Sequence, residues 1–280
     1  MRLWMQQGLR RALKTPLAAW GAASQAVRPS MPGIAFLGYH SVTGRLPLEM
    51  DLPYPVFRRQ LETLAARRAV VAYDEALAWL AAGRRPPAPR WVLTFDDGYE
   101  DFYTHVFPLL AALHLPATLF VTTGFVDDGV PYPLMARPDL TAAPVTWRML
   151  GEMAASPWVT LGAHTHTHPL LDTLPAARVE EELVRPLERF QRELGLRPRH
   201  FAYPRAIWNP ALAAQVARHY ASAVAGGEER GAAWDAYRIP RLPIRRSDGR
   251  WFFGPKLRGW LDGEEAAYRL LHRLLQRLRR

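Results

Sequence analysis

Short apolar runs alternate with amphipathic helical patterns along most of this chain, and this alternation constrains the fold more than any other feature. The strand-like runs are residues 34–39, 70–73, 91–95, 117–121, 158–161, 200–203, 221–224 and 237–244. The clearest helical patterns lie between them, at residues 56–68, 103–113, 147–153 and 175–194, and Gly195 is placed to end the last. Strands separated by helices predict a parallel sheet, and 280 residues are enough to close that sheet into a barrel.

The run at residues 91–95 leads directly to two adjacent carboxylates, Asp96 and Asp97, which are followed by Gly98. Catalytic residues of such barrels gather where strands end, so both side chains are candidates for chemistry. Taken alone, Asp-Asp-Gly would more simply be a turn with an Asx cap for the following helix. A second motif, about seventy residues further on, favours chemistry instead.

That second motif places histidines at positions 164, 166 and 168, after the run at residues 158–161. On an extended strand all three would share a face, whereas on a helical turn His164 and His168 would coincide and His166 would diverge. Pro169 disfavours helical geometry at His168, so we expect a loop or a single turn. The chain has no cysteine, which leaves His, Asp and Glu as metal ligands and suits zinc or another borderline divalent ion.

The order of these motifs resembles the polysaccharide deacetylase family, also called the NodB-homology or carbohydrate esterase 4 family, whose signatures are T-F-D-D-G and H-[ST]-x-x-H. Both are present, at residues 94–98 and 164–168. A third segment, F-A-Y-P-R-A at residues 201–206, looks like the F-A-Y-P variant of exopolysaccharide deacetylases. Further matching segments extend the resemblance over roughly residues 34–245.

The resemblance implies a distorted, incomplete (β/α) barrel and a metal-dependent hydrolase. The enzyme would remove N-acetyl groups from amino sugars of a polysaccharide, oligosaccharide or lipid-linked glycan, in exopolysaccharide biosynthesis. Asp97, His164 and His168 would bind the metal, with zinc expected and cobalt, nickel or iron as alternatives. Asp96 would be the general base, and the backbone N–H of Arg205 would donate to the oxyanion.

Two departures from the family pattern leave parts of this mechanism open. Ala202 stands where the family has an Arg that braces the catalytic Asp, and Arg241 or Arg205 could take over that role in space. In addition, no late strand ends in the L-x-H motif that usually supplies the general acid. His40, at the end of the first strand, is the first candidate to protonate the leaving amine or contact substrate, and His166 is the alternative.

Tyr203 and Trp208, within and just after the third motif, are candidate substrate contacts, because flat aromatic faces suit pyranose rings. A catalytically silent carbohydrate-binding or membrane-docked module is the alternative function, favoured by the missing Arg and acid but opposed by the intact Asp and His motifs. A non-haem iron oxygenase uses the same ligand types, yet its H-x-[DE] arrangement does not match this order.

The formal net charge is +10, and both ends of the chain are basic and moderately apolar. Residues 1–30 predict an interfacial or packing helix, residues 31–250 the deacetylase barrel, and residues 251–280 a basic helical segment packed on it. An anionic membrane surface is therefore a candidate partner. We expect a cytoplasmic protein, peripheral at the inner membrane, with export as the minority view. Nucleic acid is not an expected partner, and the sequence does not predict the oligomeric state.

Overall fold

The computed structural model describes residues 3–25, 33–128, 132–133, 141–226, 234–261, 263–264, 267–268 and 270–271. The strands of its main sheet are β1 (Ile34–Tyr39), β2 (Arg90–Phe95), β3 (Ala117–Val121), β6 (Val159–Ala163), β7 (His200–Ala202), β8 (Ser222–Gly226) and β9 (Ile239–Pro243). The helices between them are α2 (Tyr54–Ala66), α3 (Tyr73–Ala81), α4 (Phe107–Leu113), α5 (Thr123–Asp128), α6 (Trp147–Ala154), α7 (Ala176–Leu194) and α8 (Pro210–Val216). A separate antiparallel pair is formed by β4 (Tyr132–Pro133) and β5 (Thr141–Ala142).

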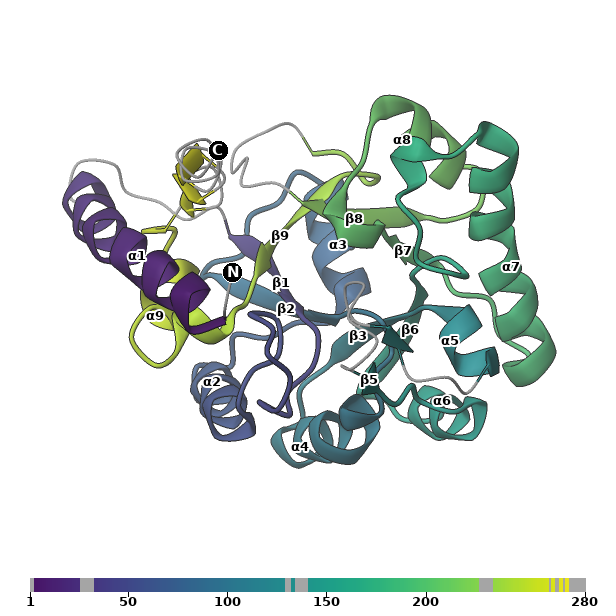
Figure 1. Ribbon diagram of the computed structural model, residues 1–280, viewed down its shortest axis with the longest axis horizontal. Coiled ribbons are helices and arrows are strands. Elements are labelled where there is room, and N and C mark those ends of the chain that lie inside the picture. Colours follow the sequence, from purple (N-terminus) through teal and green to yellow (C-terminus); the bar gives the residue numbers. More distant parts are fainter. Residues whose placement is uncertain are drawn as a thin grey trace.

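Seven parallel strands close into a barrel in the order β1-β2-β3-β6-β7-β8-β9, and α2, α4, α6 and α7 lie along its outer side (Figure 1). The predicted (β/α) barrel is thus confirmed. Residues 70–73 do not supply an eighth strand, because Val70 makes one isolated bridge to Trp91 and Tyr73 already begins α3. The ring still closes, since β9 pairs with β1. Its most distorted junction is between β6 and β7, where Ala163 and Phe201 form the one paired position.

The strand register brings the predicted site residues to the same end of the barrel. Tyr39, the last residue of β1, is paired with Phe95, the last residue of β2. The ring of Phe95 is fixed by stacking on Tyr39 at 5.2 Å and by an edge contact with Phe102 at 4.9 Å. Because the strands are parallel, the segments that follow β1, β2, β6 and β7 all leave the barrel at its carboxyl end.

The N-terminal helix α1 (Leu3–Gln25) lies outside the barrel, beside α9 (Phe253–Leu257) of the C-terminal segment (Figure 1). None of the helices in the described part of the chain is both long enough and apolar enough to cross a bilayer. Residues 1–2, 26–32 and 272–280 of the predicted terminal segments lie outside the described residues.

Two basic residues of α1 are buried in ion pairs with the C-terminal segment. Lys14 Nζ lies 2.5 Å from Asp248 Oδ1 and 2.7 Å from Ser247 Oγ. Arg10 Nη1 lies 3.2 Å from Glu264 Oε1, and Lys256 Nζ lies 2.9 Å from the second oxygen of Asp248. Burial lowers the pKa of Lys14, while the neighbouring carboxylates oppose that shift. Two of the three basic residues of this helix therefore serve packing.

We expect Lys14→Met to lower the free energy of unfolding by about 3 kcal/mol, because it leaves the fully buried Asp248 carboxylate with one cation fewer. Urea unfolding followed by circular dichroism would measure the change. Arg11→Gln, at the exposed neighbouring position, is the matched control and should stay within about 0.5 kcal/mol of the wild type. Equal stability of the two variants would contradict a stabilising role for the buried pair.

Candidate active site

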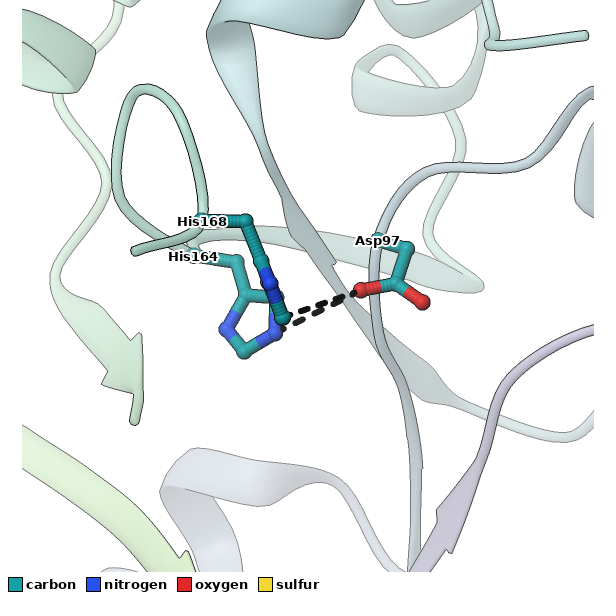
Figure 2. Close-up of side chains that lie close together, drawn as sticks. All are labelled: Asp97, His164 and His168. Carbon is teal, nitrogen blue, oxygen red and sulfur yellow. Dashed lines mark ion pairs between the residues drawn. The ribbon is translucent and has the colours of Figure 1, made fainter. Parts of the chain in front are cut away.

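Three side chains that are far apart in sequence converge at the carboxyl end of the barrel: Asp97 after β2, and His164 and His168 after β6 (Figure 2). Asp97 Oδ1 lies 3.5 Å from His164 Nε2 and 3.7 Å from His168 Nε2. Two ligand atoms held at about 2.1 Å by a tetrahedral ion are about 3.4 Å apart. The predicted grouping is therefore present, with spacings that could hold one metal ion.

The electrostatic state of Asp97 also fits a cation. Its Oδ1 atom is buried and has no hydrogen-bond partner among the described residues. Burial raises the pKa of this carboxyl to about 6. A buried oxygen that lacks a donor and faces two imidazoles is costly unless a positive ion or a proton balances it.

Both imidazoles are prepared to act as ligands through Nε2. The Nδ1–H of His164 donates to the carbonyl oxygen of Ala202 at 2.7 Å, which leaves the Nε2 lone pair directed at Asp97. Burial lowers the pKa of His164 to about 3 and that of His168 to about 4. Both rings are therefore neutral near pH 7, as metal binding requires.

The loop between the two histidines is held by Glu182, a buried residue of α7. Glu182 Oε2 accepts hydrogen bonds from the backbone N–H groups of His166 and Thr167 at 2.9 and 2.8 Å, and Oε1 accepts from the Thr167 hydroxyl at 2.7 Å. His168 itself has a left-handed φ of 57°, and its N–H donates to Thr165 Oγ1 at 3.0 Å. These bonds offset an uncommon backbone conformation and fix the second imidazole.

The brace that sequence comparison finds missing at Ala202 is supplied by Arg241 of β9. Arg241 Nη1 and Nη2 each donate to one oxygen of Asp96 at 2.6 Å, and Nη1 also lies 3.2 Å from Thr94 Oγ1. Burial would raise the pKa of Asp96, but the Arg241 guanidinium, with His164 and His40, more than offsets burial and holds the pKa well below its usual range. Arg205, the other candidate, has an exposed side chain. Asp96 is thus held ionised and in one orientation.

His40 is the better placed of the two candidate acids. Its Nε2 atom lies 3.8 Å from Asp96 Oδ2, and its side chain is partly exposed at the site. His166 instead places Nδ1 3.0 Å from Thr123 Oγ1, and its charged neighbours are on α5 and α7. The structure therefore does not bring His166 to the carboxylate pair.

The segment after β7 contains three predicted site residues, and the structure contradicts the role of one of them. The guanidinium of Arg205 contributes to lowering the pKa of His168, so its charge acts on the Asp and His cluster, and the role of its backbone N–H stays a prediction. The predicted sugar contact at Tyr203 is wrong, because this side chain is fully buried and its hydroxyl donates to the Tyr237 carbonyl at 3.0 Å. Trp208 is half-buried, with the guanidinium of Arg238 5.6 Å from its ring centre, and remains a predicted contact.

Sequence reasoning missed Glu182, although a signal for it was present. The buried stripe of α7 includes Val179, Leu183 and Pro186, and Glu182 falls on the same stripe. A carboxylate on the apolar face of an amphipathic helix needs a buried partner, and here the partner is the histidine loop.

Comparison with known proteins adds a family and a fold. The polysaccharide deacetylase family model matches residues 83–224, which contain both carboxylates and the histidine loop. The chain is 38% identical over 85 residues to the poly-β-1,6-N-acetyl-D-glucosamine N-deacetylase of Escherichia coli strain K12. That alignment covers 30% of this chain and 13% of the relative, so the chain spans only a small part of the relative's length.

Solved structures share the barrel at low sequence identity. Streptococcus pyogenes deacetylase PplD, solved in complex with acetate, aligns with a TM-score of 0.68 at 23% identity, covering 80% of this chain and 97% of that one. IcaB from Ammonifex degensii aligns with a TM-score of 0.67 at 24% identity, covering 83% of this chain and 98% of that one. At these identities the likeness supports the fold alone.

Proposed function

Because the chain belongs to the polysaccharide deacetylase family, we propose that it hydrolyses the acetamide group of an N-acetylated amino sugar in a glycan. The observation that carries this proposal is the cluster of Asp97, His164 and His168 beside the ionised Asp96. The curated relative acts, by its name, on poly-β-1,6-N-acetyl-D-glucosamine. A β-1,6-linked N-acetylglucosamine polymer is therefore the first substrate to test.

Asp97, His164 and His168 would hold the divalent ion, and zinc suits this set of one carboxylate and two imidazoles. When bound, such an ion lowers the pKa of water and polarises an amide carbonyl. Asp96 accepts the proton of the attacking water, because Arg241 keeps the carboxylate ionised and each oxygen retains a lone pair.

Completion of the reaction needs a proton for the departing amine. We assign this proton to Nε2 of His40. That atom lies 3.8 Å from Oδ2 of Asp96, the carboxylate that would accept the proton of the attacking water. The oxyanion of the tetrahedral intermediate would be stabilised by the backbone N–H of Arg205, since this turn follows Ala202, whose carbonyl accepts a hydrogen bond from His164.

The test is acetate release from β-1,6-linked N-acetylglucosamine oligomers by the full chain, before and after metal removal. Dialysis against a chelator should reduce the rate at least about a hundredfold, and stoichiometric zinc should restore it. An unchanged rate in protein shown to be free of metal would refute the metal-dependent mechanism. Tight zinc binding with no release from any glycan tested would instead favour a catalytically silent binding module.

Glu182→Ala should weaken zinc affinity by about 10- to 100-fold, because it frees the loop that carries His168. Zinc titration in competition with a coloured chelator would measure the change. Glu181→Ala is the matched control, since the neighbouring Glu181 is exposed and pairs with Arg178 on the helix surface. If both variants bind zinc like the wild type, the loop holds its shape without Glu182.

A further inference from the structure

The outward side of α1 is exposed and contains large apolar side chains. The exposed positions of this helix are residues 4, 8, 11, 12, 15, 16, 19, 20 and 23, which fall on one side of it. Trp4 and Trp20 lie near its two ends and are 67% and 70% exposed. The residues between them on this side are small or uncharged, apart from Arg11.

The opposite side of α1 fixes the helix to the body of the protein. Arg10 and Lys14 are buried in their ion pairs, and Gly21 packs so closely on the backbone of Trp260 that an added Cβ would come within 2.5 Å of it. A loosely held helix therefore does not explain why the two tryptophans are exposed. They belong to a surface of defined orientation.

The C-terminal segment adjoining α1 has the same character. Among the described residues, seven large apolar side chains are exposed, and four belong to these two segments: Trp4, Trp20, Trp251 and Leu270. Arginines accompany the aromatic rings, with the Arg250 guanidinium 4.5 Å from the Trp251 ring centre and that of Arg258 4.9 Å from Trp260. Exposed tryptophan and arginine thus concentrate where the two ends of the chain meet.

The exposed charged side chains on α1 and on residues 249–261 are all positive. Neither α1 nor residues 249–261 contain an Asp or Glu. Arg11, Arg250 and Arg258 are exposed there, whereas the carboxylates of Asp248 and Glu264 are buried against the cations of the interior. On these two stretches an anionic partner would contact arginine side chains and no exposed carboxylate.

We propose that the outward side of α1, with the flanking 250–260 segment, binds the surface of an anionic phospholipid bilayer. Tryptophan prefers the headgroup level of a membrane, and Trp4 and Trp20, near the two ends of the helix and at opposite margins of its exposed side, would hold that helix parallel to the bilayer at the headgroup level. Each exposed arginine adds attraction to anionic headgroups. The surface also lies near the carboxyl end of the barrel, because α1 is held by Ser247 and Asp248, which follow β9 where it leaves that end.

Vesicle sedimentation of the full chain tests this surface without reference to hydrolysis. The wild type should bind vesicles of phosphatidylcholine with phosphatidylglycerol, and bind phosphatidylcholine alone much more weakly. Trp4→Ser with Trp20→Ser should reduce the partition coefficient at least about tenfold. Arg11→Gln should reduce it about fivefold, on the anionic vesicles only. Trp234→Ser, at an exposed tryptophan outside both segments, is the matched control and should bind within about twofold of the wild type.

A labelling experiment keeps the proposal testable if the tryptophan variant folds poorly. The chain has no cysteine, so Thr15→Cys on the outward side of α1 can be labelled at one place with an environment-sensitive dye. Its emission should rise and shift to the blue with anionic vesicles, whereas a dye at Thr104→Cys, also exposed, should not respond.

Three results would overturn the proposal. They are absence of wild-type binding to anionic vesicles, equal binding by the double tryptophan variant, and a dye response that is the same at both positions. A concentration-dependent dimer that the tryptophan changes abolish, without any vesicle binding, would assign the surface to a second copy of the chain instead.

Discussion

Asp96→Asn should reduce kcat for acetate release about a thousandfold while the protein keeps its divalent ion. The amide has nearly the shape of the carboxylate but cannot accept a proton from water. Asp96 is bonded to Arg241 through both oxygens, whereas the candidate ligand atoms belong to Asp97, His164 and His168. Steady-state kinetics and metal analysis of the same preparation would measure both quantities.

His164→Ala is the complementary variant and should lose both metal and activity, since it removes a buried candidate ligand. Asp128→Asn, an exposed carboxylate at the end of α5, is the control for the chemical change. A rate within tenfold of wild type in Asp96→Asn would mean that another group takes the proton. Loss of metal from that variant would mean that Asp96 is itself a ligand.

Arg241→Met should lower kcat/KM about a hundredfold at neutral pH and move the acid limb of the pH profile upward. In the wild type the guanidinium lowers the pKa of Asp96 against the opposing effect of burial. Without that cation the effect of burial is opposed only by the smaller effects of His164 and His40, so the pKa rises. A base must be ionised to act, so activity disappears as pH falls through its pKa, and this loss now occurs at a higher pH.

Arg241→Lys should give an intermediate profile, because an ammonium restores the charge but not the two parallel bonds at 2.6 Å. Arg218→Met, at an exposed arginine paired with Glu180, should leave the profile unchanged. If Arg241→Met lost stability but kept the wild-type acid limb, the ion pair would be structural and the base would be tuned by another group.

Local patterns in the sequence were sufficient to predict most of the barrel and the metal cluster. Alternating apolar runs identify seven of the eight predicted strands, and the resemblance of two short motifs to the family signatures identifies Asp97, His164 and His168 as a group. Residues 70–73 failed as a strand because Tyr73 already starts α3. Short apolar runs cannot be distinguished by pattern alone from the first turn of a helix.

What the sequence could not predict depends on contacts between distant segments. From the sequence alone, Arg241 and Arg205 are equal candidates for the brace. The strand register decides between them, because it places β9 beside β1 and so brings Arg241 to Asp96. Lys14 reads as a solvent-exposed or lipid-facing cation until Asp248, 234 residues later, is found against it. A flat aromatic face makes Tyr203 a predicted sugar contact, yet its ring packs into the core, with its centre 5.3 Å from that of Phe201.

The strand that closes the barrel, β9, is also the strand that contributes Arg241, and both are synthesised after the residues of the candidate metal site. A nascent chain that has emerged as far as residue 224 already contains Asp96, Asp97 and both histidines of the cluster, but not Arg241. Its Asp96 would lack the guanidinium that contributes to keeping it ionised in the complete barrel. The ribosome therefore adds Arg241, the brace of the proposed base, only with the strand that also closes the ring. A truncated translation product could carry every residue of the metal cluster and still lack a working base.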